Sequence, residues 1–380
     1  MCLIKIRPRF VRLRQLADGE LAGSLFFRYT NAMSELALYR KYRPSGFAEV
    51  VGQEPIVQVL TGSIKQGIVA HAYLFAGARG TGKTSVARIL ARELGTSPHD
   101  LYEIDAASSR GIDDIRELRE AVRTLPFESK YKVYIIDEVH MLSKDAFNAL
   151  LKTLEEPPSH VIFILATTEV HKLPETIISR CQQFIFRQPG LDELRTVLAH
   201  AAKKEKRQLE SAALDLIALL GDGSYRDGLG VLQKCFGATA DKLITGDLVA
   251  SVTGAPAREL VAQFIEGLIK PDGALGLTVI RKLTELHRDP RVFLKLTLNT
   301  IRYAMFLKFA PTVGKELIAP LTDSERKFIE TLAERKESVS LSLILRELLM
   351  TYDEIGHSYI PELPLELAVL RIVGLLTKHV

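Results

Sequence analysis

The sequence has no long apolar run, and this absence excludes a membrane-spanning helix. Its 380 residues are 47% hydrophobic and 25% charged, and the apolar stretches are short and interrupted by charges. A spanning helix needs about 20 consecutive apolar residues. We therefore expect a soluble chain without a membrane partner, long enough for two or three domains.

Cysteine is also scarce. The chain has Cys2, Cys181 and Cys235, which lie far apart and form no C-x-x-C pair. This pattern supports neither a disulfide framework nor a zinc site made of cysteines. A reducing, cytoplasmic setting fits it best.

An excess of positive charge is absent from most of the chain. The formal net charge is +4, but residues 1–32 hold six basic side chains against two acidic ones, which leaves 44 of each in residues 33–380. Bulk charge therefore gives no reason to expect nucleic acid as a partner, and any nucleic-acid surface must be local.

The basic extension of residues 1–33 has no helical or strand period, whereas a well-patterned sequence starts at Met33. Its many arginines and few acids are typical of a targeting peptide. We favour two other interpretations, a start codon assigned too far upstream or a disordered extension.

Short apolar runs alternate with helical patterns from Ala70 onward. Runs rich in Ile, Val and Tyr without polar alternation are typical of strands buried on both faces, so the pattern predicts an α/β fold, a parallel sheet with helices on both sides, over residues 34–188. The expected strands are residues 72–76, 102–106, 132–138 and 161–168. The expected helices are residues 84–95, ending at Gly95, residues 111–125, and residues 143–156, capped by Ser143.

The rest of the chain has helical patterns only. Residues 189–252 predict a small domain of about three short amphipathic helices, and residues 253–380 predict a second all-helical domain with leucine-rich faces. The heptad pattern is too short for a coiled coil.

The segment GARGTGKT, residues 77–84, fits the P-loop pattern G-x-x-x-x-G-K-[ST] between an expected strand and an expected helix. Backbone N–H groups at such a helix start form an anion site. Its glycines let the backbone approach phosphate, Lys83 reaches the β and γ oxygens, and Thr84 offers its hydroxyl to Mg²⁺. The alternative is a glycine-rich turn with a solvated lysine.

The segment VYIIDEVH supplies two acids at the end of an expected buried strand. Asp137 is placed to hold Mg²⁺, and Glu138 is placed to orient and deprotonate a water that attacks the γ-phosphate. The two carboxylates could instead cap a helix. His140 receives no role. Arg180, in the segment ETIISRCQQF, is by itself an edge arginine with a packed stem and a solvated head.

Several segments follow one another in a characteristic order: YRKYRPSGFAEVVGQ, GARGTGKTS, EIDAAS, IDEVHMLSKDAFNALLKTLEEPP, ATT, SRC and GSYRD, within residues 36–230. Their order resembles that of the bacterial DNA polymerase III gamma/tau family, the AAA+ ATPase subunits of clamp loaders. PLELAVLRI near the end is similar to the last collar helix of that family.

The resemblance implies an ATPase with a RecA-like base, a helical lid and a collar that holds five subunits in a ring. It implies ATP and Mg²⁺ as cofactors. It also implies other clamp-loader subunits, the sliding clamp and primer-template DNA as partners, in the bacterial cytoplasm at the nucleoid. The implied function is ATP-driven opening of the clamp and its loading onto DNA. DNA polymerase activity would belong to the holoenzyme, because the chain shows no acidic triad of a polymerase palm.

The resemblance also assigns roles to single residues. Thr168 matches sensor 1, and Arg226 matches sensor 2 at the start of a lid helix that Ser224 can cap; alternatively, Arg226 pairs with Asp227 or another surface acid. Arg180 matches the arginine finger, which acts in trans on the ATP of the adjacent subunit. The expected catalytic residues are Lys83, Glu138, Thr168, Arg180 and Arg226. The expected nucleotide-binding residues are Tyr39, Arg40, Pro44, Val51, Gly77, Ala78, Arg79, Gly80, Thr81, Gly82, Lys83, Thr84 and Ser85, with Thr84 and Asp137 as the Mg²⁺ ligands.

The chain departs from the family pattern in three places. Members commonly carry a four-cysteine zinc module before EIDAAS, but only GTSPHDL is present here, so no zinc is expected. Gly228 and Gly230 stand where helix formers are expected, at a cost of about 1 kcal/mol each relative to Ala, so a looser lid helix is expected. The extra tau domains that bind helicase and polymerase are expected to be missing.

Two basic residues near expected helix starts, Arg110 and Lys144, are candidates for DNA phosphate contacts. Ordinary solvated charges are the alternative. Two other functions remain open: a non-catalytic loader scaffold, against which the intact P-loop and acids argue, and another AAA+ DNA motor, such as a Holliday-junction translocase or a recombination factor. The SRC segment and the collar-like region argue against that motor.

We expect residues 1–32 to be dispensable. A chain that starts at Met33 should match the full chain in melting temperature and ATPase rate, because the patterned sequence begins there. Calorimetry and a phosphate-release assay measure both quantities. A stability loss above about 1 kcal/mol, the size of a typical single-mutation effect, would show that the segment packs against the rest.

Overall fold

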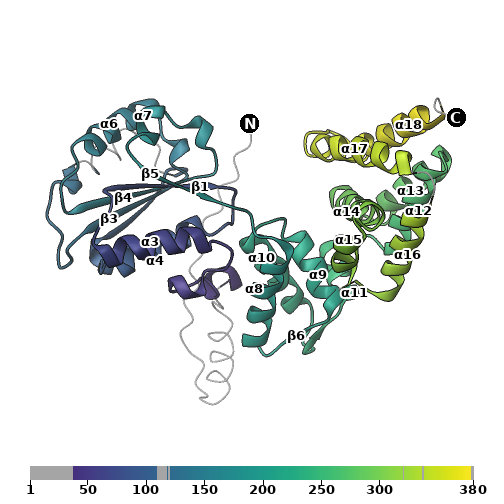
Figure 1. Ribbon diagram of the computed structural model, residues 1–380, viewed down its shortest axis with the longest axis horizontal. Helices are drawn as coiled ribbons and strands as arrows, with labels where there is room; N and C mark the ends of the chain where they lie inside the picture. Colours follow the sequence, from purple (N-terminus) through teal and green to yellow (C-terminus); the bar gives the residue numbers. More distant parts are fainter. Residues whose placement is uncertain (1–36, 109–117, 119, 320, 336–337, 378–380) are drawn as a thin grey trace, which may run out of the picture.

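Five strands form a parallel sheet, drawn at the left of Figure 1. The computed structural model describes residues 37–108, 118, 120–319, 321–335 and 338–377. The strands are β1 (Ala72–Gly77), β2 (Leu101–Asp105), β3 (Lys132–Asp137), β4 (Val161–Thr167) and β5 (Gln182–Phe186). Their order is β2-β3-β4-β1-β5, and each pair is parallel, so the predicted parallel sheet is confirmed.

The helices fall into three groups along the chain. The first group is α2 (Leu38–Lys41), α3 (Glu54–Gln66), α4 (Lys83–Glu93), α6 (Lys144–Glu155) and α7 (Glu175–Ile178), with the 3-10 turns η1 (Phe47–Glu49), η2 (Pro98–Asp100), η3 (Val139–Met141) and η4 (Val170–Lys172). The second is α8 (Leu191–Lys204), α9 (Ser211–Leu220), α10 (Tyr225–Ala238) and α11 (Gly246–Thr253), with the short strands β6 (Gln208–Leu209) and β7 (Leu243–Ile244). The third is α12 (Arg258–Ile269), α13 (Gly273–Glu285), α14 (Pro290–Phe309), α15 (Pro311–Ile318), α16 (Asp323–Glu334), α17 (Ser338–Ile355) and α18 (Leu363–Thr377). The extension of residues 1–33 and most of the helix expected at 111–125 lie outside the described residues.

Helices cover both faces of the sheet, because successive side chains of a strand point to opposite sides. Tyr73 and Phe75 of β1 pack with α3 and α4 on one face, and Ala72 and Leu74 pack with α6 and α7 on the other. Figure 1 shows these helix pairs on either side of the strands. The strands β1, β3 and β4 are buried almost throughout, which explains their continuous apolar runs.

Local signals determine three helix ends near the sheet. Gly95 follows α4 in the left-handed conformation, with φ at +77°. Ser143 Oγ accepts from the N–H of Ala146 at 3.2 Å at the start of α6. Ser224 Oγ accepts from the N–H of Asp227 at 3.2 Å at the start of α10. All three predicted ends are therefore confirmed.

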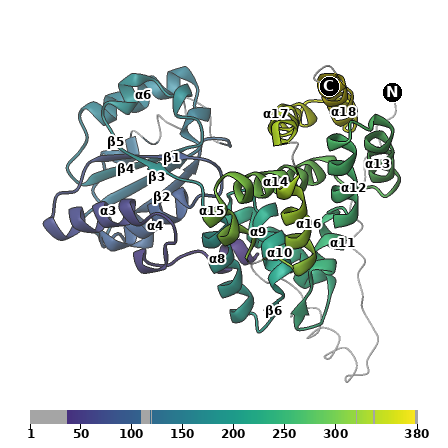
Figure 2. The ribbon, with the colours of Figure 1, turned by 45° about the vertical axis from the view of Figure 1, so that its right-hand side comes forward.

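Helices α8 to α11 pack around a second core. Figure 1 shows these helices between the sheet and the last helices, and Figure 2 shows them in a second view. Leu38 of α2 is buried in this core, so the segment before the sheet packs on helices that follow it. Gly228 of α10 lies close to Gly221, whose Cβ, if present, would be 3.1 Å from the Cα of Gly228. The helix runs unbroken through Gly228 and Gly230, and a looser lid helix stays a prediction.

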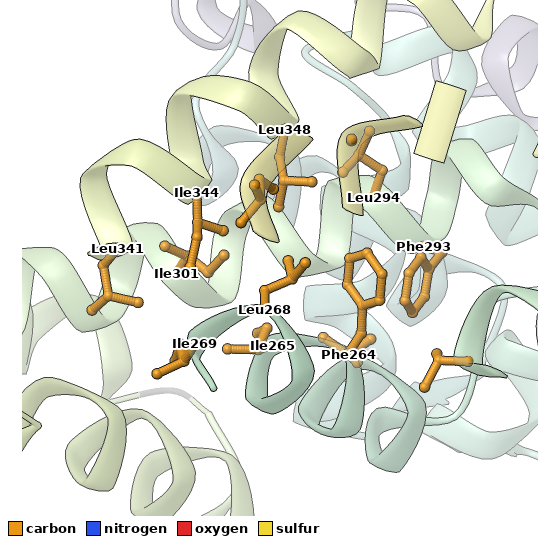
Figure 3. Close-up of a cluster of buried hydrophobic side chains, with 14 of the residues drawn as sticks. Phe264, Ile265, Leu268, Ile269, Phe293, Leu294, Ile301, Leu341, Ile344 and Leu348 are labelled. Atoms are coloured by element: carbon orange, nitrogen blue, oxygen red, sulfur yellow. The ribbon is translucent and has the colours of Figure 1, made fainter. Parts of the chain in front are cut away.

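Helices α12 to α18 enclose a third core, part of which appears in Figure 3. The rings of Phe264 and Phe293 meet edge to face, with centroids 5.0 Å apart, and Leu268 and Ile301 lie nearby in the same core. In the described part of the chain, no helix is long and apolar enough to cross a membrane. The domain boundaries at 34–188, 189–252 and 253–380 stay predictions.

The short segment between α4 and β2 is held by a buried carboxylate. Asp100 is 0% exposed, and its oxygens accept from the N–H groups of Phe127, Glu128 and Ser129 at 2.5, 3.0 and 2.9 Å. No cluster of three His, Cys, Asp or Glu that could hold a metal occurs among the residues described. That the protein binds no zinc stays a prediction.

Asp100→Asn should lower the free energy of unfolding by about 2 kcal/mol, because buried N–H groups lose a charged acceptor. Burial raises the pKa of Asp100, but the N–H donors of residues 127–129 outweigh burial and hold the pKa well below its ordinary value. This contribution is therefore complete above the ordinary aspartate pKa of about 4 and is lost as the pH falls below it. Urea unfolding should show a constant difference between wild type and variant above about pH 5 that shrinks below about pH 4.

Glu128→Gln is the matched control in the same loop. Its side chain is exposed and only its backbone N–H contacts Asp100, so its stability should stay within about 0.5 kcal/mol of wild type. Equal losses in the two variants would contradict the role given to the Asp100 carboxylate.

Candidate functional site

A cavity of about 910 Å³ opens at the carboxyl end of β3, beside the loop that follows β1. Its walls come from residues 39–51 before the sheet, from residues 79–88 of the loop and α4, and from the start of α10. The volume lies in the range of ligand pockets, about 300–1,000 Å³. Three parts of the chain that are distant in sequence therefore form one site.

The loop between β1 and α4 carries its lysine inward. Lys83 is 6% exposed, and its ammonium donates to Gly77 O and Ala78 O, each at 2.8 Å. Burial lowers the pKa of Lys83, and the charges of Glu138 and Asp137 oppose that shift. The first N–H groups of α4 have no partner within the helix, and the residues that carry them line the cavity.

Asp137 ends β3 beside this loop. Its Oδ2 accepts from Thr84 Oγ1 at 2.8 Å, so the structure brings together the two residues expected to hold Mg²⁺. Glu138 follows in a left-handed backbone conformation, with φ at 47°, which is uncommon outside glycine. Its side chain lines the cavity and makes no capping bond to the turn η3.

Glu138 is linked to the end of β4. Its Oε2 accepts from the hydroxyl of Thr168 at 3.0 Å and from the N–H of Thr168 at 3.3 Å. The side chain of His140 is 6% exposed, and its Nδ1 lies 3.4 Å from the same oxygen and 3.0 Å from Thr167 Oγ1. Thr168 therefore contacts the expected water-activating carboxylate, although it does not itself line the cavity.

The start of α10 joins the loop to the segment before the sheet. The N–H of Tyr225 donates to Gly80 O at 3.1 Å, and its hydroxyl donates to Val51 O at 2.9 Å. The guanidinium of Arg226 lies 5.8 Å from the ring centroid of Tyr39 and lines the cavity. Within the described residues Arg226 forms no ion pair, so the alternative of pairing with a surface acid is not observed.

Arg180 lies away from the cavity. It follows α7, and its guanidinium donates to Thr176 O at 2.8 Å and to Glu155 Oε1 at 2.7 Å. Its side chain is 33% exposed, whereas Ile177 is buried. The structure thus shows a packed neighbourhood with a guanidinium at the surface, and it does not bring Arg180 to the cavity of its own chain.

Most residues expected to bind the nucleotide line the one cavity. They are Tyr39, Arg40, Pro44, Val51, Arg79, Gly80, Thr81, Gly82, Lys83, Thr84 and Ser85. Gly77 and Ala78 are the acceptors for Lys83. The DNA candidate Lys144 is exposed at the first position of α6, and the DNA candidate Arg110 lies outside the described residues.

Five charged residues line the cavity without having been predicted as site residues: Arg43, Glu49, Arg88, Glu103 and Asp105. Arg88 forms an ion pair with Glu103 at 2.6 Å. Spacing was the available signal for Arg88, which follows Thr84 by four residues and so shares its face of α4. Arg43 and Glu103 lie in the segments YRKYRPSGFAEVVGQ and EIDAAS, which carry the family resemblance, but neither residue was assigned to the site.

Two family descriptions match parts of the chain. The family description "DNA polymerase III, delta subunit" matches residues 96–190, and "DNA polymerase III subunits gamma and tau domain III" matches residues 244–379. A solved structure of the Thermotoga maritima RuvB Holliday junction branch migration motor is similar with a TM-score of 0.49 at 23% identity, covering 60% of this chain and 79% of that one.

Two curated relatives cover most of the chain. The Bacillus subtilis DNA polymerase III subunit tau is 38% identical over 361 residues, which is 90% of this chain and 63% of that protein. The DNA polymerase III subunit gamma of Buchnera aphidicola subsp. Baizongia pistaciae is 32% identical over 364 residues, which is 90% of this chain and 98% of that protein. The chain thus spans less than two thirds of the tau relative.

The order of the sheet, the loop after β1 and the helical lid that contacts this loop define an AAA+ P-loop protein. Within that class, the gamma relative matches along almost its whole length. The chain belongs to the family of DNA polymerase III gamma and tau subunits.

Gly80→Ala should separate the lid from the loop. Gly80 has φ at +75°, and a Cβ there would lie 1.9 Å from Ser224 Oγ, the cap of α10. The strain and the displaced cap should together cost roughly 2–4 kcal/mol of unfolding free energy. Urea unfolding measures the loss, and hydrogen exchange should speed up at the Tyr225 amide that bonds to Gly80 O.

Gly95→Ala is the control for backbone strain alone. Gly95 has φ at +77° with no atom within 4 Å of the added Cβ, so only about 1–2 kcal/mol should be lost. If both variants lost the same amount and the Tyr225 amide kept its protection, the contact between Gly80 and Ser224 would not hold the lid.

Proposed function

We propose that the chain binds ATP with Mg²⁺ and hydrolyses it as the motor subunit of a DNA polymerase III clamp loader. The observation that carries the proposal is the meeting of Lys83, Thr84, Asp137 and Glu138 at one cavity. The proposed partners are other clamp-loader subunits in a five-subunit ring, the sliding clamp and primer-template DNA. The proposed setting is the bacterial cytoplasm, at the nucleoid.

The residues of the cavity fit a nucleoside triphosphate. The ammonium of Lys83 is held by two neutral carbonyls, and a phosphate oxygen is a stronger partner for a charged donor. The paired oxygens of Thr84 and Asp137 suit Mg²⁺, which usually takes one or two protein ligands and completes its shell with water and phosphate. A site of this kind needs no cluster of three acidic or histidine ligands.

Each residue of the site has a separate role in the proposed hydrolysis of ATP. Bound Mg²⁺ would offset negative charge on the phosphate oxygens. Lys83 and Arg226 bind phosphate from the base and from the lid, and Glu138 accepts a proton from the attacking water. The two bonds from Thr168 hold the Glu138 carboxylate in one orientation. Arg180 of an adjacent copy completes the site from outside the chain.

The surface position of Arg180 supports a role between subunits. Its guanidinium lies outside its own cavity and is bound by an exposed carboxylate, a pair that typically contributes about 0–1 kcal/mol. A planar guanidinium binds phosphate with two parallel hydrogen bonds, which a neighbour's nucleotide can accept. Lys144, exposed at the start of α6, is the proposed DNA phosphate contact among the described residues.

Arg180→Ala should leave ATP affinity and folding of the isolated chain nearly unchanged, because Lys83 and Arg226 still hold the nucleotide. In the assembled loader, with clamp and primer-template DNA, hydrolysis should fall by a factor on the order of 10³. Lys83→Ala should abolish ATP binding in its own chain. Rings that mix the two variants should regain hydrolysis that neither variant shows alone, measured by phosphate release.

Some outcomes would contradict this assignment. Weaker ATP binding by the isolated Arg180→Ala chain would place Arg180 in its own site. Mixed rings could also assemble normally, as judged by their mass, and yet stay inactive. That result would show that Arg180 does not act on the ATP of the adjacent subunit. Wild-type ATPase that clamp and DNA do not stimulate would favour another AAA+ motor over a clamp loader.

A further inference from the structure

His140 places a buried ring beside the carboxylate of Glu138. It lies in the turn η3, which begins two residues after the end of β3, and its side chain is 6% exposed. Burial takes the polar ring away from water, so its nitrogens need partners within the protein. The contacts of the two nitrogens therefore indicate what the ring does.

The Nδ1 atom of His140 faces two oxygens. It lies 3.0 Å from Thr167 Oγ1 and 3.4 Å from Glu138 Oε2. An ionised carboxylate only accepts, and a hydroxyl accepts as well as donates. A hydrogen on Nδ1 makes both contacts favourable, whereas a lone pair there would face the carboxylate. We therefore assign a hydrogen to Nδ1.

The same oxygen of Glu138 is held from a second side. Thr168 donates to Oε2 from its hydroxyl at 3.0 Å and from its N–H at 3.3 Å. The other oxygen, Oε1, forms no hydrogen bond with the residues that the structure describes, and Glu138 lines the cavity. Thr168 and His140 thus fix one oxygen of the carboxylate and leave the other for a water in the cavity.

The second nitrogen of the ring faces a carboxylate outside the cavity. Nε2 of His140 lies 3.6 Å from Glu169 Oε1. Glu169 is itself held, because its N–H donates to Thr167 Oγ1 at 3.0 Å and its Oε2 pairs with Lys172 at 2.6 Å. A base whose orientation is set by a further group is the usual arrangement in hydrolytic sites.

We propose that His140 is a positioning residue for hydrolysis, whose Nδ1 holds Glu138 in the orientation in which Oε1 meets the attacking water. The inference rests on the proposed function, because it needs Glu138 to act as the base. His140 does not line the cavity, so it acts through Glu138 and not on the nucleotide. It should therefore affect the rate of hydrolysis and leave ATP binding unchanged.

His140→Ala in the full-length chain tests the inference in the assembled loader, with clamp and primer-template DNA. We expect kcat for ATP to fall about 10- to 100-fold, because the base is no longer held toward the water. KM, and the ATP affinity of the isolated chain, should stay within about twofold of wild type. Phosphate release measures kcat and KM, and calorimetric titration measures the affinity.

Two amide variants separate the two nitrogens of the ring. His140→Asn can place an N–H near the position of Nδ1 and should regain much of the kcat that His140→Ala loses. His140→Gln can place an N–H near the position of Nε2 and should not. Both variants replace the ring with an amide, so a purely structural role would lower activity in both alike. This comparison decides the question even if His140→Ala does not fold.

A double variant tests whether His140 acts through Glu138. Glu138→Gln removes the base, so adding His140→Ala to it should lower kcat no further. His171→Ala is the matched control. His171 is exposed, its Nε2 also lies 3.6 Å from Glu169, and it forms no ion pair with Glu138 among the described residues. Its loss should change neither kcat nor melting temperature.

Three results would overturn the inference. They are a folded His140→Ala variant with kcat within about twofold of wild type, equal kcat for the Asn and Gln variants, and a further loss when His140→Ala is added to Glu138→Gln. If the wild-type loader hydrolyses ATP and Glu138→Gln does not, these results remove the inference and keep the proposed function. A wild-type loader without ATPase activity would remove both.

Discussion

The contact between Gly80 and the start of α10 is the constraint on which the candidate site depends. Ser224 approaches Gly80 so closely that any Cβ would overlap its hydroxyl, and Tyr225 ties the same glycine to Val51. Because of this junction, Arg226 and Tyr39 share a cavity with Lys83. The geometry of the site is therefore determined by the packing of the loop after β1 against the start of α10 and the segment before the sheet. The packing within each of these parts only orients the side chains that line the cavity.

Charge is distributed unevenly within this cavity. Asp137 and Glu138 lie at the end of β3, close enough to Lys83 to oppose the lowering of its pKa by burial, whereas the arginines gather toward the lid and the segment before the sheet. A ligand that carries a cation at one end and several negative charges along its length matches both regions at once. A neutral ligand would leave the charges of both regions uncompensated. The distribution of charge therefore favours a charged ligand over a neutral ligand of the same shape.

The elements that depend on short stretches of sequence could be predicted. The buried strands, the caps Ser143 and Ser224, and the pairing of Thr84 with Asp137 follow from local propensity and from the rule that parallel strands place their carboxyl ends at one edge. The bonds of the Asp100 carboxylate and the position of Arg43 could not be predicted. These contacts join segments that are distant in the sequence, and the periodicity of apolar residues within one segment does not predict which other segment it will meet. Arg180 could be predicted in part, because its segment alone indicated a packed stem with a solvated head and its guanidinium lies at the surface, whereas its partner Glu155 comes from a different segment.

The ion pair between Arg180 and Glu155 has a consequence for the chain before it meets a neighbour. A bare guanidinium on an exposed face attracts polyanions of every kind, and the backbone of nucleic acid is the most abundant of these in a cell. Glu155 lies 2.7 Å from Arg180 and cancels its charge at short range. Since an exposed pair is weak and screened by salt, the same carboxylate gives up the guanidinium readily. In the proposed assembly, the free subunit would present a nearly neutral spot on the face from which Arg180 reaches its neighbour, and nonspecific adsorption there would be suppressed at almost no cost to that assembly.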